Sequence, residues 1–295
     1  MRFGKVFISR SQCIFENLAF EEWLLRNHNC SKNGEVMLLW SNKPAVVIGR
    51  HQNPWKEVNF PYIRQNGIAF ARRHSGGGAV YHDLGNLNIS ILTEHSRHCR
   101  IRNLEMISSA VNEAYNVQVS SNSRQDLNLQ PGDRKISGTA ARISREMAYH
   151  HMTLLVSVDL SVLKTALKSP FKDSVFTKAT SSVSAPAVGF LNQDDPSVTV
   201  ESLTDVVAEA FRRQYEDSRM VIVPDITDEL HFPGVGTNEH FLRSYQWLYG
   251  KSPAFSARCR SGRLVNVEKG IITKVEDSTQ KHLIGQKFQT DFFMT

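Results

Sequence analysis

The sequence predicts an α+β fold in which a mixed sheet carries flanking helices. Short runs of continuous or alternating apolar residues, typical of strands, lie between segments whose apolar residues recur at helical spacing. The two kinds of segment follow one another without the regular rhythm of a doubly wound sheet, which favours a mixed sheet over a parallel one. With 295 residues, 41% of them hydrophobic and 22% charged, the chain can bury one large core and carry a small additional domain.

Strands predominate among the elements expected in the first hundred residues. The apolar run 6–8 predicts an opening strand, and residues 16–27 have apolar pairs four positions apart, as one face of a helix does. Two apolar strands are expected at 36–40 and 45–49, with turn-forming Ser, Asn and Pro between them. Over residues 87–91, Leu and Ile alternate with Asn and Ser, which predicts a strand buried on one face.

Helices and strands alternate irregularly in the remaining two thirds. Asn103 is expected to cap a helix because apolar residues follow it at helical spacing. Residues 153–158 predict a buried strand followed directly by a short helix, and Pro196 is tolerated in the first turn of another. The Pro/Gly/Asp-rich segment 221–237 is expected to be irregular. Two short strands are expected within 263–275.

Charge and cysteine content exclude several classes of protein. The net charge of +6 suits a phosphate-bearing or acidic partner but is small for a nucleic-acid binder. No apolar run is long enough to span a membrane. Neither a secretory signal nor room for a transit peptide precedes the first strand, which predicts a cytosolic protein or else a processed or incomplete form. The cysteines lack metal-binding spacing, so that reduced thiols and no metal site are expected at Cys13, Cys30, Cys99 and Cys259.

A run of three glycines beside two arginines is the most informative motif. Residues 72–86 read Arg-Arg-His-Ser-Gly-Gly-Gly-Ala-Val-Tyr-His-Asp-Leu-Gly-Asn. Without a Cβ, Gly76, Gly77 and Gly78 can turn successive N–H groups toward a ligand, and a concavity of amides binds phosphate. The two arginines would add attraction for an anion. The alternative is a glycine hairpin on a basic surface. The spacing matches neither GxxxxGK[ST] nor GxGxxG, the common nucleotide-binding motifs.

A second motif is Lys135-Ile136-Ser137-Gly138-Thr139-Ala140. Its lysine lies at the edge of an expected strand, before small residues. The mobile ammonium group of a lysine can stay in contact with a substrate carboxylate while that carboxylate is converted into a phosphoryl ester. The alternative is a solvated lysine before a turn. Asp126 supplies a nearby carboxylate, whereas the pair at 150–151, both histidines, favours a structural role over a metal site. These parts suit an acyl-adenylate whose acyl group passes to an amine, with the carboxylate taking the proton.

These two motifs together resemble those of the lipoate–protein ligase A/lipoyltransferase family. The resemblance extends over most of the chain, from Val6 to about Ser256. In motif detail it is nearer to the animal mitochondrial lipoyltransferases than to the bacterial ligases. The further segments that carry the resemblance are Asn17–Trp23, Val47–Trp55, Asp225–Gly234 and Trp247–Ser256.

The resemblance implies a biotin/lipoate ligase-like fold, related to the class II synthetase core. It implies a catalytic domain over residues 1–243 and a small, truncated accessory domain over residues 244–295. Such proteins bind lipoyl-AMP as an intermediate and pass its lipoyl group to a lysine. By position in the motifs, Lys135 is implied to bridge the acyl carbonyl and the α-phosphate, and Asp126 to lie near the reacting centre. The residues implied to bind the adenylate and lipoyl group are Arg73, Ser75, Gly76, Gly77, Gly78, His82, Asn86 and Thr153.

The leading hypothesis is a mitochondrial acyltransferase. It would deliver a lipoyl or octanoyl group, from lipoyl-AMP or from a lipoylated donor such as H protein, to E2-type acceptor domains of 2-oxoacid dehydrogenases. One alternative is a complete ligase that uses ATP and Mg²⁺, although the short segment after Trp247 favours transfer alone. Another is a non-catalytic lipoyl-binding protein, which would need neither Lys135 nor Asp126. Octanoyl transfer through a cysteine thioester is disfavoured because no cysteine lies near either motif, and neither nucleic acid nor a membrane is expected as a partner.

Overall fold

The chain forms two compact units in the computed structural model, which describes residues 3–183, 185, 187–223 and 225–294. Each unit is assembled from three separate stretches of sequence. The predicted division into a catalytic domain, residues 1–243, and an accessory domain, residues 244–295, stays a prediction. Unit 1 comprises Met1–Pro44, His82–Leu160 and Ser184–Glu239, and unit 2 comprises Ala45–Tyr81, Ser161–Val183 and His240–Thr295.

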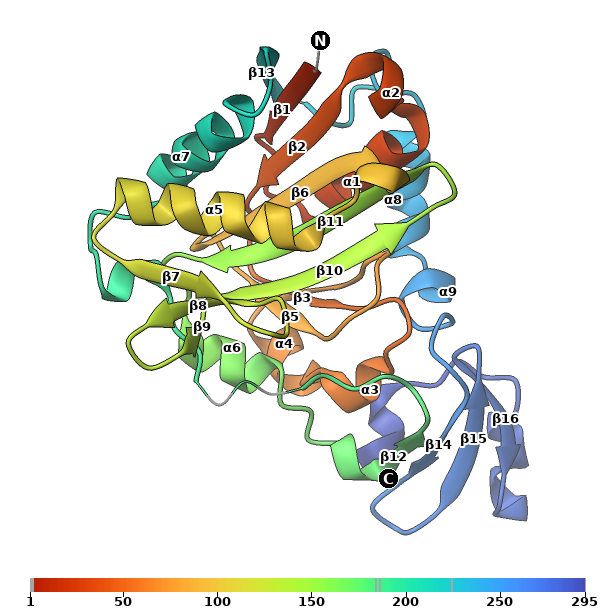
Figure 1. The fold of residues 1–295 in the computed structure, drawn as a ribbon. Coiled ribbons are helices and arrows are strands. Elements are labelled where there is room, and N and C mark those ends of the chain that lie inside the picture. The colour runs from red at the N-terminus through yellow and green to blue at the C-terminus, as the bar shows by residue number, and fades with distance from the viewer. Residues whose placement is uncertain (1–2, 184, 186, 224, 295) are drawn as a thin grey trace. The chain divides into compact units, whose positions relative to one another are not determined.

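A six-stranded mixed sheet is the centre of unit 1 (Figure 1). Its strands are β1 (Phe3–Ser9), β2 (Glu35–Trp40), β6 (Asn86–Glu94), β10 (Ser137–Ile143), β11 (Met147–Leu155) and β13 (Asp217–Val223). Their order in the sheet is β10-β11-β6-β2-β1-β13. The pairs from β10 to β2 are antiparallel, whereas β1 runs parallel to both β2 and β13. This mixed pairing confirms the predicted α+β class.

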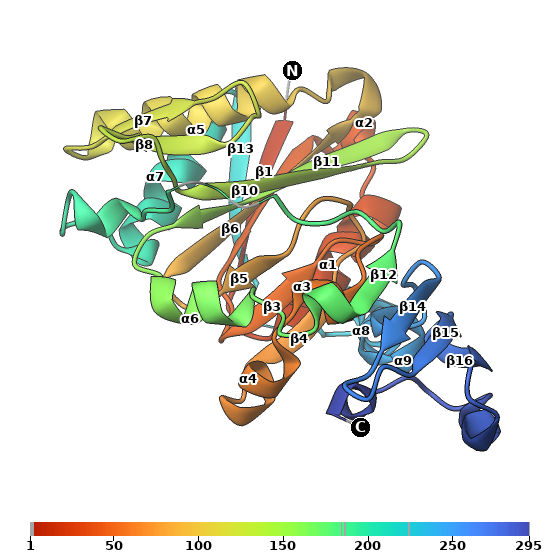
Figure 2. The ribbon, with the colours of Figure 1, turned by 90° about the horizontal axis from the view of Figure 1, so that it is seen from below.

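Helices cover both faces of this sheet. On one face, α5 (Arg100–Ala114) and α7 (Val200–Arg212) pack their apolar residues with those of the strands into the main hydrophobic core. The helix α1 (Ile14–Asn27) contacts β6 and β11 from the other side (Figure 2). Asn88 and Ser90 of β6 are therefore only 3% exposed. The prediction that this strand is buried on one face is wrong, because α1 covers its polar side as well.

Two helices of unit 1 begin elsewhere than expected. α5 starts before Asn103, which lies inside the helix, is 4% exposed and donates from its side-chain amide to His150 at 3.3 Å. α7 starts after Thr199, whose side chain caps it, so that Pro196 lies outside the helix. In both cases a residue that is tolerated near a helix start was taken for the start itself. The short helix α2 spans Cys30–Asn33.

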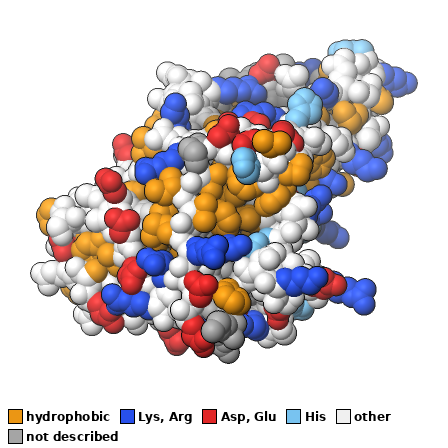
Figure 3. Space-filling model, turned by 90° about the horizontal axis from the view of Figure 1, so that it is seen from above, with side chains coloured by type: hydrophobic (Ala, Val, Ile, Leu, Met, Phe, Trp, Pro, Cys, Tyr) orange, Lys and Arg blue, Asp and Glu red, His pale blue; other side chains and the backbone are white. Residues whose placement is uncertain are grey.

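The edge strand β13 was not expected, since its last residues fall in the segment predicted to be irregular. It pairs residue by residue with β1, which is remote in sequence. Met220, Val221 and Ile222 of this strand are exposed, and hydrophobic side chains gather on the face of the molecule seen from above (Figure 3). Parallel pairing with a distant strand leaves no signal in the local residue pattern, which is why the prediction failed.

A smaller antiparallel sheet in unit 1 carries the lysine motif. It consists of β7 (Gln118–Ser121), β8 (Leu127–Gln130) and β9 (Arg134–Lys135), in that order. Lys135 pairs with Asn128 of β8, and its N–H donates to the carbonyl of Ala187 at 3.0 Å. The Gly189 N–H in turn donates to the Lys135 carbonyl at 3.0 Å. The backbone of the lysine is thus bonded on both sides.

Unit 2 is built around an aromatic core. The ring centroid of Trp55 lies 5.1 Å from that of Phe255 and 5.0 Å from that of Phe288. Phe171 stacks on Phe293 with 4.3 Å between ring centroids. Because these rings come from all three stretches of unit 2, the C-terminal residues are part of its core.

The strands of unit 2 form a three-stranded sheet and a four-stranded sheet. The three-stranded sheet comprises β4 (Ala69–Arg72), β3 (Ala45–Ile48) and β5 (Val80–His82). His82, the last residue of β5, belongs to unit 1. The four-stranded sheet comprises β12 (Val175–Thr177), β14 (Phe255–Arg258), β15 (Leu264–Glu268) and β16 (Ile271–Val275). The two strands expected within 263–275 are thus confirmed as β15 and β16. Further helices are α3 (Pro54–Glu57), α4 (Phe60–Gln65), α6 (Leu160–Ala166), α8 (Val235–Arg243) and α9 (Tyr245–Leu248). None of the helices in the described ranges is long and apolar enough to cross a membrane.

Candidate functional site

The triple-glycine loop lies in unit 2 and is braced by Arg73. This arginine is 5% exposed, and its guanidinium donates from Nη2 to the carbonyls of Gly76 at 2.6 Å and Gly78 at 2.8 Å. Nε donates to Oγ of Ser75 at 3.0 Å, and Nη1 to the Val47 carbonyl at 3.2 Å. Arg73 therefore turns the carbonyls of the loop toward itself, which leaves the N–H side of the loop for another partner. Its predicted direct contact with an adenylate stays a prediction.

The conformation of the loop requires glycine at two positions. Gly77 has a φ of +88°, which residues with a Cβ rarely adopt. Gly49 comes so close to the loop that a Cβ on it would lie 2.1 Å from the Gly77 carbonyl oxygen. The N–H groups of Gly76, Gly77 and Gly78 have no acceptor within the part of the chain that the structure describes. Three such groups in succession form the kind of amide concavity that binds phosphate.

A second support for the loop comes from residues that the sequence did not indicate. Oγ of Ser182 accepts hydrogen bonds from the Ala79 N–H at 2.8 Å and from Nε2 of Gln52 at 3.0 Å. Oε1 of Gln52 accepts one from the Gly49 N–H at 2.9 Å. Gln52 lies in Val47–Trp55, a segment that carries the family resemblance, and this resemblance was the signal that could have identified it. Ser182 lies in a Ser/Ala/Thr-rich stretch and carried none.

Arg72, the first of the two adjacent arginines, is directed into the core of unit 2. Its side chain is fully buried, and burial lowers its pKa to about 9, so the guanidinium is still charged at neutral pH. It is held by neutral oxygens 2.8 to 3.3 Å away, on Gly49, Arg50, Gln52, Leu248 and Ser252. Its backbone carbonyl accepts a hydrogen bond from the Trp247 indole at 2.7 Å. Arg72 therefore ties the turn after β3 to the C-terminal stretch instead of facing a ligand.

Unit 1 brings Lys135 and Asp126 together. The Lys135 ammonium Nζ lies 2.8 Å from Oδ2 of Asp126, and the aspartate residue is 8% exposed. The Asp126 N–H donates to Oδ1 of Asn122 at 3.1 Å, which fixes the backbone before β8. Sequence reasoning expected both groups near one reacting centre. Their contact agrees with that expectation, while their roles stay predictions.

The small residues after the lysine are bonded to the strands around them. The Gly138 N–H donates to Oγ1 of Thr153 at 2.8 Å, across the β10–β11 ladder. Oγ of Ser137 accepts a hydrogen bond from the Leu127 N–H at 2.7 Å. Thr153 is 7% exposed, so its hydroxyl shapes the lysine motif in this structure. Its predicted place in the lipoyl pocket stays a prediction.

His82 is oriented by a chain of buried amides in unit 1. Nδ2 of Asn42 lies 3.0 Å from Nδ1 of His82. Oδ1 of Asn42 accepts from Asn17 at 2.9 Å, and Oδ1 of Asn17 accepts from Ser9 at 2.7 Å. Because an amide NH₂ only donates, Nδ1 of His82 accepts, and in the neutral ring the proton lies on Nε2. Asn17 belongs to a segment that carries the family resemblance, whereas Asn42 was read only as a turn residue.

Asn86 is the predicted site residue with the most evident capacity for a ligand. It is fully buried, and neither Oδ1 nor Nδ2 has a hydrogen-bond partner within the described ranges. Its backbone groups are hydrogen-bonded: the carbonyl accepts from the Ser41 hydroxyl at 2.8 Å, and the N–H donates to the Asp83 carbonyl at 3.1 Å. A buried amide without partners is costly, so a ligand or a bound water is expected there.

The histidine pair is built into a strand of unit 1, and its predicted structural role stays a prediction. His150 and His151 lie within β11, which begins at Met147 and so earlier than the strand expected at 153–158. Burial, together with the charges of Arg100 and the neighbouring histidines, lowers the pKa of His150 to about 2. Nδ1 of His151 contacts Oε1 of Glu21 at 2.9 Å.

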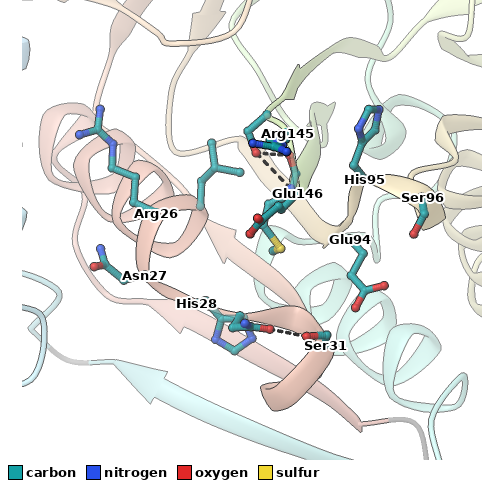
Figure 4. A pocket seen from close by; sticks show the side chains of 13 residues that line it. Arg26, Asn27, His28, Ser31, Glu94, His95, Ser96, Arg145 and Glu146 are labelled. Atoms are coloured by element: carbon teal, nitrogen blue, oxygen red, sulfur yellow. Dashed lines mark hydrogen bonds between the residues drawn. The ribbon is translucent and has the colours of Figure 1, made fainter.

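A pocket of about 910 Å³ in unit 1 lies at the far end of the β10–β11 hairpin from the lysine motif (Figure 4). None of the predicted site residues lines it. Its acidic and basic residues offset one another, so the pocket shows no preference for a charged ligand; they are Glu94, Glu146, Arg26 and Arg145. Elsewhere in unit 1, among the residues that the structure describes, potential metal-ligand atoms of Cys13, Glu16 and Glu239 lie within 4.8 Å of one another.

The catalytic-domain model of lipoyl protein ligases A and B matches residues 13–212 of this chain. Human mitochondrial lipoyl amidotransferase LIPT1 is 40% identical over 254 residues, which are 86% of this chain and 67% of that protein. The crystal structure of P. falciparum LipL1 in complex with lipoate is 26% identical, with a TM-score of 0.71 over 91% of this chain and 82% of that one. A lipoate-protein ligase A bound with ATP is 22% identical, with a TM-score of 0.66 over 85% of this chain and 100% of that one, which supports the fold alone.

The family model spans most of the chain, and both motifs lie inside the matched range. The predicted fold of the lipoate ligases and the predicted class of acyltransferase are confirmed by these matches. The chain therefore belongs to the lipoyl protein ligase A/B family.

Proposed function

We propose that this chain transfers a lipoyl or octanoyl group to one lysine of E2-type acceptor domains, taking it from lipoyl-AMP or from a lipoylated donor such as H protein. The observation that carries the proposal is the contact of Lys135 with Asp126 in the family's lysine motif. A protein that only bound lipoylated ligands would need no carboxylate beside this lysine. The pair supplies both the positive charge and the proton acceptor that acyl transfer to an amine requires.

With lipoyl-AMP as the donor, the reaction exchanges a C–O bond for a C–N bond; with a lipoylated protein, the donor lysine leaves in place of AMP, with the electrons of its C–N bond, and takes up a proton. The acceptor amine attacks the acyl carbonyl carbon, and the resulting tetrahedral centre expels AMP, which leaves with the electrons of the C–O bond. Lys135 stabilises the negative charge that develops on the carbonyl oxygen and on the phosphate. Asp126 accepts the proton that the amine loses. In the free protein the two side chains contact each other, and this contact opens when Lys135 turns to the substrate.

The remaining polar groups are proposed to hold the adenylate. In unit 2, the unused N–H groups of Gly76, Gly77 and Gly78 would receive the α-phosphate. In unit 1, the unpartnered amide of Asn86 would bond a polar group of a ligand, and His82 is the second proposed contact there. Arg73 would act on the ligand through the shape of the loop, and its direct contact with the adenylate stays part of the proposal.

The donor and the location are proposed from the relatives. LIPT1 is named a mitochondrial lipoyl amidotransferase, and we propose mitochondrial transfer for this chain as well. LipL1 is in complex with lipoate, and a more distant ligase is bound with ATP. ATP and Mg²⁺ are needed here only under the alternative that the chain itself forms lipoyl-AMP from free lipoate.

Three parallel assays test the proposal. The full chain is mixed with an apo acceptor domain and given lipoyl-AMP, a lipoylated donor protein, or free lipoate with ATP and Mg²⁺, and acceptor lipoylation is read by mass spectrometry. Transfer from either of the first two donors is expected. Activity with free lipoate and ATP would establish the ligase alternative. Binding of lipoyl-AMP without transfer from any donor would refute the enzyme and support a binding protein.

A further inference from the structure

Arg100, the first residue of α5, reaches the lysine motif across unit 1. Its Nη2 donates to Oγ1 of Thr139 at 2.6 Å. The Thr139 hydroxyl donates in turn to the carbonyl of Gln125 at 3.1 Å. Gln125 precedes Asp126, whose carboxylate contacts Lys135 at 2.8 Å. A continuous set of bonds therefore links the start of α5 to the reactive pair.

We infer that Arg100 is a positioning residue for acyl transfer, which holds Asp126 in place through Thr139 and Gln125 and keeps a positive charge beside it when Lys135 turns to the substrate. The inference rests on the proposed function of the Lys135–Asp126 pair. It concerns how that pair is supported, which neither motif reveals.

The backbone before Asp126 needs such support. Gln125 has a φ of +61°, a left-handed conformation that residues with a side chain adopt reluctantly. Its N–H donates to the Asn122 carbonyl at 3.0 Å, so the turn is closed from one side. The Thr139 hydroxyl holds the carbonyl of Gln125 from the other side. Strained backbone persists where surrounding bonds determine it, and here those bonds lead to Arg100.

The charge of Arg100 also bears on Asp126. Burial lowers the pKa of Arg100, whereas the negative charge of Asp126 raises it, so the two groups interact. Nε of Arg100 is buried and has no hydrogen-bond partner among the residues described. Two cations thus act on Asp126, Lys135 from β9 and Arg100 from α5. When Lys135 moves to the acyl-adenylate, Arg100 keeps the carboxylate from being buried without a counter-charge.

Other charged groups near Arg100 do not replace it. Its charge contributes to the lowered pKa values of His98 and His150. His150 stays neutral over the range of an enzyme assay because its pKa is about 2. Arg102, two residues further along α5, is 4.0 Å from Glu35 of β2. Arg102 is therefore a matched control on the same helix.

The test compares Arg100→Gln, Arg100→Lys, Thr139→Val and Arg102→Gln in transfer from lipoyl-AMP to an apo acceptor domain. Arg100→Gln is expected to lower kcat by about 100-fold, the loss that a misplaced reacting group causes, with the acceptor KM changed less than about threefold. Thr139→Val lowers kcat in the same way, and Thr139→Ser recovers most of the loss. Arg100→Lys keeps the charge and recovers part of the rate, and Arg102→Gln matches the wild type.

The split between kcat and KM, with recovery in Thr139→Ser, separates positioning from a general loss of structure. The NMR chemical shift of the Asp126 amide reports the same turn without any turnover, because this amide follows the Gln125 carbonyl that the Thr139 hydroxyl holds. The shift is expected to change in Arg100→Gln and in Thr139→Val but not in Arg102→Gln. Failure of the wild type with every donor would defeat the proposed function and leave this inference open to that NMR measurement. An unchanged Asp126 amide shift in Arg100→Gln, or a kcat of Arg100→Gln equal to that of Arg102→Gln, would overturn the inference.

Discussion

Replacement of Arg72 by methionine tests how the C-terminal stretch of unit 2, His240–Thr295, is joined to the rest of that unit. Methionine keeps the length and the apolar stem of the side chain but removes the charge and every donor. In the structure all three guanidinium nitrogens donate, to carbonyl oxygens on two separate stretches of unit 2 and to the Ser252 hydroxyl. The variant leaves these oxygens buried and unbonded while the backbone around them stays in place.

The magnitude follows from the number of acceptors. Four oxygens lose the guanidinium donor, on Arg50, Gln52, Leu248 and Ser252, whereas the Gly49 carbonyl keeps the Gln52 N–H at 3.2 Å. At about 1 kcal/mol for each buried acceptor left unbonded, the cost sums to about 4 kcal/mol. The variant recovers some free energy because it no longer buries a charge. We therefore expect unit 2 to lose about 2 to 4 kcal/mol of unfolding free energy, a large part of what an average domain has.

Urea unfolding measures this loss, with the fluorescence of Trp247 as the probe, because its indole donates to the Arg72 carbonyl. Arg72→Lys keeps a charge on fewer donors and should lose about half as much. Arg258→Met is the matched control, since Arg258 is exposed and lies over the Phe176 ring in the same unit. It should stay within about 0.5 kcal/mol of the wild type. A loss below about 1 kcal/mol in Arg72→Met would refute the reasoning.

Three further predictions follow from the site and its surroundings. Lys135→Ala should abolish acceptor lipoylation from lipoyl-AMP while circular dichroism stays that of the wild type; near-normal turnover would contradict its role. Gly49→Ala places a Cβ 2.1 Å from the Gly77 carbonyl and should weaken lipoyl-AMP binding at least about tenfold in calorimetry, as a displaced cradle would. An unchanged affinity would mean that the loop does not bind the adenylate. His150 stays neutral when folded, so the folded state binds fewer protons than the unfolded state below pH 6.5, and stability falls as pH falls. At pH 4.5 the neutral buried imidazole costs the folded state about 2.7 kcal/mol of unfolding free energy. The unfolding free energy of His150→Gln, measured in urea, should therefore fall by correspondingly less between pH 6.5 and pH 4.5. Equal pH dependence in the variant and the wild type would contradict the prediction.

Local pattern was sufficient where an element buries its own apolar residues. The predicted helix 16–27 and strands 36–40 and 45–49 agree with α1, β2 and β3 to within two residues at either end. The pattern failed where a distant partner decided the outcome. The edge strand β13 exists through its parallel ladder with β1, and β6 is buried on its polar side because α1 covers it. No window of sequence contains both partners of such a contact.

The site divides in the same way. From the sequence alone came both motifs, the hypothesis of acyl-adenylate chemistry and the expectation that Lys135 and Asp126 lie near one reacting centre, because glycine, lysine and carboxylate have few substitutes in that chemistry. Only the tertiary structure shows that Arg73 braces the glycine loop and that Arg72 is buried among neutral oxygens. Only it connects Arg100 with the lysine motif. The five N–H donors of an arginine can bond a ligand or backbone oxygens equally well. The groups that surround the arginine in three dimensions therefore decide which of the two it binds.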